Sequence, residues 1–372
     1  MNEGCRLPIA LLGLFGAGGL HATEVAVCTD RGRAVFELED AAAPLQVANF
    51  LRYVDMGFFS GTVFHRALPG FVVQGGGVDR QLRGRATLAP VASESSNGLS
   101  NARGTIAAAR LQDPNTATAQ FFVNLEDNTA LDDGREPGYT VFGHVKEGIA
   151  IFDEISRLPT GAAGPFAADV PTTLVAIESI ARLDEEALAA YPAEGREVAL
   201  KSAIEAAAAA DDTAEALRLI GHYRAICGAN DPEIALSEAR MALAADARRR
   251  TTFVLEELFA TTDPTHPSRA AATALYRQAL QVVAGCEPPM PPTLPDAAAA
   301  TTEEMLAAQQ QVRGFVAAGE TYLTCLTTVI DDEARSAEDR NVAVGEHNRV
   351  VSAMEQSAAA FNEQIRIFKA RP

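Results

Sequence analysis

The sequence predicts two structural classes in one chain: a closed antiparallel β-barrel of about eight strands capped by two α-helices, then an all-α domain ending in a long antiparallel helical hairpin. Three observations predict this. Short alternating runs with Gly- and Asn-rich connections fill residues 24–183, two amphipathic helical patterns interrupt them, and from Asp184 the composition shifts to Ala, Glu, Leu and Arg with helical spacing. The chain has 372 residues, 48% of them hydrophobic, so each part can bury a core.

Short strands and two helices are expected in the first half. Val35–Glu39 alternates like a half-buried strand and follows a turn at Asp30–Gly32. One helix begins at Pro44, which suits the first helical turn, and the other covers about Ile149–Leu158. Many short strands with two such helices are typical of a closed barrel whose ends are covered by helices. The other expected strands are Thr62–Ala67, Phe71–Gly75, Gly104–Arg110, Phe121–Leu125, Thr140–Val145 and Thr173–Leu183.

The region after the barrel divides into three parts. Residues 185–285 have helical periodicity and a helix start at Asp231–Glu233, where an acidic capping residue precedes a proline. Helical hairpins could stack there as repeats, although the sequence has no clean self-match at a spacing of about 34 residues. Residues 286–300 are rich in proline and alanine, which predicts an extended linker.

Residues 301–372 predict an antiparallel coiled-coil-like hairpin. Apolar residues recur at alternating spacings of three and four along two stretches of equal length, joined by a polar turn near residues 331–336. The first seam is Met305, Ala308, Val312, Phe315, Gly319, Tyr322, Leu326 and Val329, and the second is Val344, His347, Val351, Met354, Ala358, Phe361, Ile365 and Phe368.

The N-terminus has the order of a secretory signal peptide. Arg6 precedes an apolar run at residues 7–20, and Ala22 provides a small residue at the expected cleavage point. The run is shorter than the roughly 20 residues that a spanning helix needs, and an uncleaved membrane anchor is the alternative. We therefore expect residues 1–22 to be a signal peptide and the mature protein to be exported, to an oxidising compartment such as a bacterial periplasm.

Four cysteines remain after such cleavage. An even number in an oxidising compartment permits disulfides without fixing their pairing, which stays open among Cys28, Cys227, Cys286 and Cys325. Cys28 falls in an expected barrel strand, so a buried free thiol is the simplest interpretation. Cys286 with Cys325 is the first choice for a bridge.

Composition and spacing argue against several kinds of site. The formal net charge of −18 argues against a nucleic-acid partner, which needs a basic face. The cysteines and histidines lack the spacing of metal ligands, so no metal is expected. Gly75–Gly77 resembles a tight turn more than a phosphate loop, because no suitably spaced helix start or lysine follows it. The sequence after the N-terminal run contains no stretch apolar enough for an integral membrane span.

The most specific signal is the segment Val63–Gly76, which reads VFHRALPGFVVQGG. It closely resembles the cyclophilin pattern F-H-R-x-x-P-G-F-x-x-Q-G-G. Blocks similar to the family's later ones follow in order and with fitting gaps: Gly104–Arg110, Ala119–Val123, Leu131-Asp132 and Tyr139–Gly143. Residues 23–184 thus resemble a cyclophilin-type peptidyl-prolyl cis/trans isomerase, and the resemblance does not extend past Asp184.

The reaction implied by this resemblance, rotation about an X–Pro bond, makes a clear chemical demand. The bond rotates slowly because resonance gives it double-bond character, with a barrier of roughly 18–20 kcal/mol. Twisting returns the lone pair to the prolyl nitrogen, so a fixed cation that hydrogen-bonds this nitrogen stabilises the twisted state over both planar ones. Arg66 suits this catalytic role because its guanidinium is rigid and always charged. The reaction requires no nucleophile, metal or cofactor.

An apolar pocket must hold the proline ring while the neighbouring amide rotates. Gln74 can hold the substrate backbone near the rotating carbonyl, and the resemblance adds the backbone of Arg110, with Gln120, to the substrate-binding set. The expected pocket residues are Phe71, Phe122 and Leu131, with Val72 and Tyr139 at the rim.

Taken alone, each of these residues has a simpler interpretation. Arg66 would be a solvated surface charge, and Phe71 and Phe122 would be core residues. Gln74 would satisfy backbone groups. His65 is interpreted as structural because the rotation moves no proton. The ordered blocks around Arg66 favour the functional interpretation.

Three positions depart from the family pattern. Ala130 stands where an aromatic residue commonly precedes Leu-Asp, Val72 is smaller than the frequent methionine, and Ala119 replaces the usual serine. The pocket should be wider, which puts recognition of the family's cyclic-peptide inhibitor in doubt. Arg66 is retained, so altered affinity is expected more than lost catalysis.

Three functions are compatible with these features. The leading one is a peptidyl-prolyl isomerase that acts on proline-containing polypeptides and assists the folding of exported proteins. The runner-up is a peptide-binding scaffold with weak or no turnover. In the third, the C-terminal helices carry a chaperone-like main function. In the leading hypothesis these helices bind a protein partner or mediate self-association.

Overall fold

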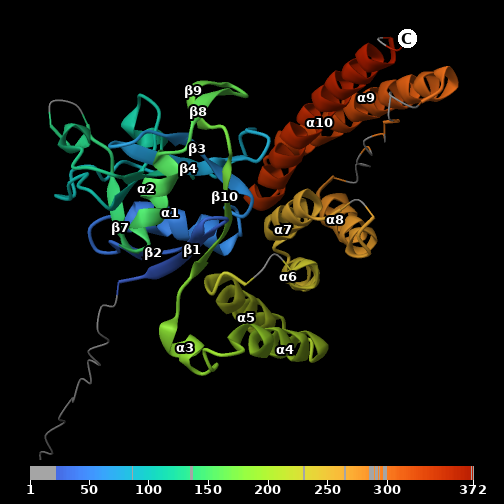
Figure 1. The fold of residues 1–372 in the computed structure, drawn as a ribbon. Coiled ribbons are helices and arrows are strands. Elements are labelled where there is room, and N and C mark those ends of the chain that lie inside the picture. Colours follow the sequence, from blue (N-terminus) through green and yellow to red (C-terminus); the bar gives the residue numbers. More distant parts are fainter. Residues whose placement is uncertain are drawn as a thin grey trace, which may run out of the picture.

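The computed structural model describes residues 22–372 except 86, 135–136, 229–230, 264, 285–288, 290–291, 293, 296–299, 370 and 372. In this described part, eight antiparallel strands close a barrel in the order β1-β10-β3-β4-β6-β5-β7-β2, and helices follow it (Figure 1). Both predicted classes are confirmed. The barrel strands are β1 (Glu24–Thr29), β2 (Gly32–Leu38), β3 (Thr62–Ala67), β4 (Val72–Asp79), β5 (Thr105–Ala108), β6 (Phe121–Asn124), β7 (Val141–Glu147) and β10 (Val175–Arg182).

Phenylalanine rings fill the barrel interior. Phe121 on β6 meets the rings of Phe36, Phe50, Phe59 and Phe64 edge-on, with centroid distances of 5.7–6.3 Å. Edge-to-face contacts of this kind add to the stabilisation that burial of the rings already provides. The side chain of Phe121 therefore points into the barrel, which fixes the inward and outward faces of β6.

Two helices cover the barrel as predicted. Helix α1 (Pro44–Asp55) places Phe50 5.2 Å from Phe142 between ring centroids, and α2 (Ile149–Ser156) places Phe152 5.8 Å from Phe36. A separate hairpin of β8 (Thr160–Ala163) and β9 (Phe166–Pro171) was not predicted. Its small residues lack a clear apolar alternation, and it packs against the outside of β3.

The helical region begins directly after the barrel. The predicted start at Asp231 is confirmed, since its carboxylate accepts a hydrogen bond from the Glu233 N–H at 2.8 Å. Consecutive helices pack against each other, as α4 does with α5 and α6 with α7. Whether they form a repeat family stays a prediction. The helices are α3 (Glu185–Ala189), α4 (Arg196–Ala209), α5 (Thr213–Ala225), α6 (Pro232–Ala244), α7 (Arg248–Thr261), α8 (Ser268–Ala284), α9 (Thr302–Ile330) and α10 (Ala337–Lys369).

Helices α9 and α10 form the predicted hairpin, which extends away from the barrel (Figure 1). Thr301 and Glu304 make a reciprocal capping box at the start of α9. All eight predicted seam residues of α9 are buried. Gly319 belongs to this seam because a Cβ there would lie 2.5 Å from Met354 Sδ on α10.

The predicted seam of α10 is wrong in its N-terminal half. Val342, Ala343 and Val350 are buried there, whereas Val344 and His347 are only half-buried. This half packs on α7 and α8 as well as on α9, so a neighbouring face of the helix becomes the buried one. In the C-terminal half, Phe361 is buried as predicted.

The helical region docks closely onto the barrel. Phe253 of α7 joins the hydrophobic cluster of the barrel, with its ring edge-on to Phe58 at 5.3 Å between centroids. Close by, the guanidinium of Arg80 contacts Glu257 of α7 at 2.9 Å. An aromatic contact and a half-buried ion pair thus join the two parts.

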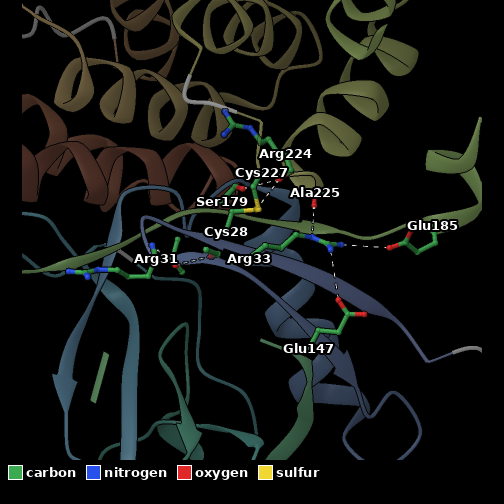
Figure 2. Close-up of a disulfide and its surroundings, with 11 residues drawn as sticks. Cys28, Arg31, Arg33, Glu147, Ser179, Glu185, Arg224, Ala225 and Cys227 are labelled. Carbon is green, nitrogen blue, oxygen red and sulfur yellow. Dashed lines mark hydrogen bonds and ion pairs between the residues drawn. A yellow bond between two sulfur atoms is a disulfide. The ribbon is translucent and has the colours of Figure 1, made fainter. Parts of the chain in front are cut away.

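A disulfide between Cys28 on β1 and Cys227 after α5 reinforces this docking (Figure 2). The expectation that Cys28 is a free thiol is therefore wrong. Spacing could not show the pairing, because 199 residues separate two Cα atoms that lie 5.4 Å apart. Cys325 is also disulfide-bonded, but Cys286 lies outside the described residues, so its expected pairing with Cys325 stays a prediction.

The end of α5 is held against the barrel by polar contacts around this bridge (Figure 2). Ser179 Oγ on β10 donates to the carbonyl of Arg224 at 3.1 Å, and Arg33 Nε on β2 donates to the carbonyl of Ala225 at 3.2 Å. Carbonyls at a helix C-terminus have no partner within the helix. The barrel therefore supplies side-chain donors for the last turn of α5.

The N-terminal run could not be compared with the structure. Residues 1–21, which make up nearly all of the expected signal peptide, lie outside the described residues. Across the residues that the structure describes, none of the helices combines the length and the hydropathy that spanning a bilayer demands.

Replacing Cys28 and Cys227 together with alanine should destabilise the protein. The bridge joins residues 199 positions apart, and removing such a cross-link lowers the free energy of unfolding by about 2–5 kcal/mol. Urea denaturation under non-oxidising and non-reducing conditions measures this difference against the unmodified chain. Identical unfolding midpoints would show that the non-covalent contacts alone set the stability of the interface.

Candidate active site

Five residues lie in one row across the outer surface of the barrel. Three of them were predicted for the site, and the other two continue the row. Arg66 on β3 pairs with Gln74 on β4, Gln74 pairs with Phe122 on β6, and Phe122 pairs with Ala107 on β5. Ala107 in turn pairs with Val141 on β7. Paired residues of neighbouring strands project from the same face of a sheet. The row therefore sets a cation, an amide and an apolar surface side by side.

A β-bulge on β3 turns Arg66 to this outer face. Phe64 points into the barrel, where its ring meets Phe121, and regular alternation would also point Arg66 inward. The register shifts between Phe64 and Arg66, so that Phe64 pairs with Gly75 and Arg66 with Gln74. An extra residue of this kind reorients the side chain that follows it.

A tight turn connects β3 to β4 beside the row. The Phe71 N–H donates to the Leu68 carbonyl at 3.1 Å, with Pro69 and Gly70 at the centre of the turn. Gly70 has φ +68°, which glycine adopts without steric cost, and proline suits the position before it. This turn places the half-buried ring of Phe71 next to Val72.

The predicted pocket residues gather into one apolar cluster. Val72, Ala107, Phe122 and Val141 are buried in it. Tyr139 packs edge-on against Phe122, with ring centroids 5.5 Å apart. The half-buried residues around these four are Leu68, Phe71, Leu99, Ala109, Leu131 and Tyr139.

The polar candidates lie around this cluster. Gln74 Nε2 donates to Gln120 Oε1 at 2.8 Å, so the two predicted glutamines contact each other directly. The guanidinium of Arg110 lies over the Tyr139 ring at 4.5 Å and donates to several carbonyls, including that of Pro137 at 2.5 Å. The side chain of Arg110 thus fixes the loop that carries Tyr139.

Arg66 is half-exposed beside the glutamines. Its Nε lies 3.7 Å from Asp169 Oδ2, with 43% of the Arg66 side chain and 36% of the Asp169 side chain accessible. Asp169 belongs to β9 and has φ +65°. The unpredicted β8–β9 hairpin therefore brings a carboxylate to the predicted catalytic cation. At this distance it is an ion pair and not a hydrogen bond.

Sequence reasoning missed a buried polar network that positions Leu131 and Tyr139. Asn101 is fully buried, and its Nδ2 donates to the Leu131 carbonyl at 3.1 Å and to Asp132 Oδ1 at 3.0 Å. Asn124 Nδ2 donates to Asn101 Oδ1 at 3.2 Å. Buried, fully bonded networks of this kind hold a loop in one conformation. The only sequence signal was the Leu131-Asp132 block itself.

Asp132 is ionised in this network. Partial burial acts to raise its pKa, but hydrogen bonds from the Asn101 N–H and Ser100 Oγ outweigh burial, so the pKa of Asp132 lies below its usual value. An ionised carboxylate is a strong acceptor for these donors. The loop of Leu131 is therefore held firmly at neutral pH.

The departures from the family pattern fall at different depths. Ala119 is buried in the barrel core and does not reach the groove, whereas Val72 lies in the groove cluster itself. Ala130 is exposed next to Leu131. The structure thus places Val72 in the predicted pocket cluster and Ala130 at an exposed position before Leu131.

His65 is a buried structural residue, in agreement with its interpretation from the sequence. Its ring packs on Phe166 of the β8–β9 hairpin at 5.0 Å between centroids. Burial lowers the pKa of His65 to about 4, with the Arg66 charge acting in the same direction. The imidazole is therefore neutral at physiological pH.

Substituting His65→Phe should flatten the pH dependence of stability. Between pH 6.5 and about 4 the unfolded chain binds a proton at this residue that the folded chain does not, so stability is complete above pH 6.5 and falls as the pH drops. Urea unfolding at pH 7 and pH 4.5 should show a loss about 2 kcal/mol larger in the unmodified chain. Parallel losses in both proteins would contradict the buried neutral histidine.

Comparisons with known proteins agree with this geometry. Residues 24–181 match the family described as cyclophilin type peptidyl-prolyl cis-trans isomerase. The chain is 45% identical over 159 residues to peptidyl-prolyl cis-trans isomerase A of Dickeya dadantii, covering 42% of this chain and 83% of the relative. It is 44% identical over 156 residues to peptidyl-prolyl cis-trans isomerase B of Escherichia coli, covering 41% and 94%.

A solved structure is also similar to part of this chain. The cyclophilin type peptidyl-prolyl cis-trans isomerase of Cryptosporidium parvum is 24% identical, with a TM-score of 0.37, and the match covers 44% of this chain and 98% of that one. The family match ends at residue 181, before the helical region. Because it covers 83% and 94% of the Dickeya dadantii and Escherichia coli isomerases at 45% and 44% identity, the chain belongs to the cyclophilin-type peptidyl-prolyl cis-trans isomerases, and its barrel is such an isomerase.

Proposed function

We propose that Arg66 catalyses X–Pro rotation by donating a hydrogen bond to the prolyl nitrogen while the apolar cluster holds the proline ring. The observation that carries this proposal is the row Arg66–Gln74–Phe122 across three neighbouring strands. Strands lie about 4.8 Å apart, so roughly 10 Å separates the backbones of Arg66 and Phe122. That gap suits a prolyl residue lying over β4, with its ring toward Phe122 and its nitrogen toward Arg66.

The charge of Arg66 acts chiefly on the twisted amide. In the planar amide the nitrogen lone pair is delocalised into the carbonyl, so the nitrogen is a poor acceptor. In the twisted amide the lone pair is localised, and a charged donor stabilises it. A contact that strengthens only in the transition state lowers the barrier instead of only tightening binding.

The neighbours of Arg66 suit this role. Asp169 holds the Nε side of the guanidinium at 3.7 Å, which limits its motion without a close hydrogen bond that substrate would have to break. Gln74, fixed by Gln120 at 2.8 Å, can receive the substrate backbone beside it. We propose that the expected set of Phe71, Val72, Phe122, Leu131 and Tyr139 forms the proline pocket, with Gln120 and the Arg110 backbone contacting the peptide.

We also propose that the protein assists the folding of exported polypeptides. The Cys28–Cys227 bridge supports this, because structural disulfides persist in oxidising compartments. The signal-like order of residues 1–22 points the same way. A periplasmic location is the corresponding proposal for a bacterial chain.

The alternatives receive less support. A scaffold without turnover would not need Arg66 presented with Gln74 and Phe122 in one row. A chaperone function of the hairpin would need exposed apolar surface, and among the described residues of α9 and α10 the large apolar side chain that stands out as exposed is Leu306, at 56%. We therefore propose the helical region as an appended module and assign it no client.

Substituting Arg66→Ala should slow isomerisation strongly. The lost charged hydrogen bond is worth roughly 1.5–3 kcal/mol, which predicts about a ten- to hundredfold fall in kcat/KM. A proline tetrapeptide isomerisation assay measures the rate. The rate of Arg66→Lys should lie between those of the unmodified chain and Arg66→Ala, because an ammonium keeps the charge but cannot present the same planar donors. The exposed Arg157→Ala is the matched control and should retain full activity. Equal rates for Arg66→Ala and Arg157→Ala would refute the mechanism.

Residues 23–184 produced alone should fold and isomerise. We expect this fragment to be less stable than the full chain, because Phe58 loses its contact with Phe253 and Cys28 loses Cys227. The tetrapeptide assay and a thermal unfolding curve measure both properties. An unfolded fragment would count against the proposed boundary at residue 184, and a fragment as stable as the full chain would count against the importance of the interface.

A further inference from the structure

A cavity lies where the barrel meets the helical region, and its described lining includes none of the expected substrate-binding residues. The cavity has a volume of about 470 Å³ and is bounded by the loop after β4, α7, α8 and the N-terminal half of α10. Figure 1 shows this end of α10 beside the barrel and next to α7. A volume of this size suits a small molecule.

The charge of the cavity wall is opposite to that of the chain. Seven arginines and four carboxylates stand among the described lining residues, although the whole chain has 49 acidic and 31 basic residues. The arginines come from four separate elements and are not neighbours on one surface helix. A positive, partly enclosed wall in an acidic protein concentrates anions.

Ion pairs neutralise only part of this charge. Arg80 pairs with Glu257 at 2.9 Å, and Arg83 pairs with Asp79 at 2.6 Å. The third pair joins Arg349 to Glu346 at 2.5 Å. Three of the four carboxylates therefore already have an arginine of their own.

The fourth carboxylate, Glu256, contacts a tyrosine hydroxyl. It accepts a hydrogen bond from Tyr276 Oη at 3.2 Å. Burial raises the pKa of Glu256, and the nearby charges of Arg85 and Arg349 oppose that rise without cancelling it. The ionised form of Glu256 is thus disfavoured relative to an exposed carboxylate.

Two lining arginines are held by backbone carbonyls instead of carboxylates. Arg85 Nη1 donates to the carbonyls of Phe58 and Ser60 at 2.5 and 2.7 Å. Arg269 Nη2 donates to the carbonyls of Phe259 and Thr262. Within the described part of the chain neither guanidinium has a carboxylate at ion-pair distance. Glu256, Glu257 and Asp79 act on the charge of Arg85 from farther away and compensate it only in part.

Aromatic rings fix the orientation of these guanidinium groups. Arg85 lies over Phe253 at 5.4 Å, and Arg269 lies over Phe259 at 5.6 Å, from Cζ to the ring centroid. Stacked arginines lose little additional freedom when they bind a ligand. Planar, fixed guanidinium groups match the oxygens of phosphate and carboxylate groups.

We propose that this interface cavity binds a small polyanion, a molecule that carries two or more phosphate or carboxylate groups. Arg269 and Arg277 on α8 and Arg85 from the barrel contact its oxygens, while Phe253 and Phe259 hold the guanidinium planes. Such a ligand bridges the isomerase barrel and the helical region, and its binding stabilises their docking.

Titration calorimetry of the full chain with pyrophosphate and, separately, with citrate tests this site at low ionic strength. We expect saturable 1:1 binding of at least one anion and a raised Tm in its presence. Binding of pyrophosphate alone assigns a phosphate ligand, and binding of citrate alone assigns a carboxylate ligand. Arg269→Gln should weaken binding by about ten- to hundredfold. The exposed Arg277→Gln should also weaken it and leaves the buried contacts in place.

A variant that is expected to tighten anion binding, and not to weaken it, separates an effect on binding from an effect on folding. Glu256→Gln keeps an acceptor for Tyr276 and removes the repulsive carboxylate, so it should tighten anion binding by up to about tenfold. Arg157→Gln, at the exposed C-cap of α2 and outside the described cavity lining, is the charge-matched control and should bind as the unmodified chain does. The proposal is overturned if neither anion binds saturably, or if Arg269→Gln and Arg277→Gln bind like Arg157→Gln.

Discussion

The functional surface depends on the two-residue period of the barrel strands and on one interruption of it. Phe121 points into the aromatic core, so its neighbour Phe122 must point out to the groove. The same rule would point Arg66 inward after Phe64, and the bulge on β3 reverses it. Without the bulge the guanidinium would have to enter a core of phenylalanine rings, where an unpaired charge is very costly. The bulge therefore reconciles a stable barrel with an arginine at the groove.

The helical region is joined to the barrel by several contacts in addition to the chain connection. Phe253 completes an aromatic contact of the barrel, and the Cys28–Cys227 bridge holds the end of α5 on β1. The barrel also supplies Ser179 and Arg33 as donors for the last carbonyls of α5. Covalent, aromatic and polar contacts thus all join the helical region to the barrel.

Local sequence patterns predicted the elements and residues that depend on nearby sequence. The features that the sequence did not predict depend on contacts between distant parts of the chain. The α9 seam follows from spacing because α9 has one dominant partner, whereas the N-terminal half of α10 also meets α7 and α8 and therefore buries Val342 and Ala343. The expected pocket residues stand in or beside the motif blocks and lie in one cluster, but Asp169 lies on a hairpin of small residues without a strand pattern. Asn101 and Cys227 act through partners distant in sequence, which no spacing reveals.

Two arginines lie near the proposed proline site, and their surroundings differ in a way that bears on which one can contact a substrate. The guanidinium of Arg110 stacks on Tyr139 and donates to the carbonyls of Leu111, Gln112, Pro137 and Gly138, so its donors are already used in holding a loop. Arg66 has only the 3.7 Å contact with Asp169 among its described partners, and 43% of its side chain is accessible. A donor can stabilise a transition state only if it is not committed elsewhere in the ground state. This contrast supports the proposal that Arg66 supplies the catalytic charge and that the Arg110 side chain supports the proposed pocket.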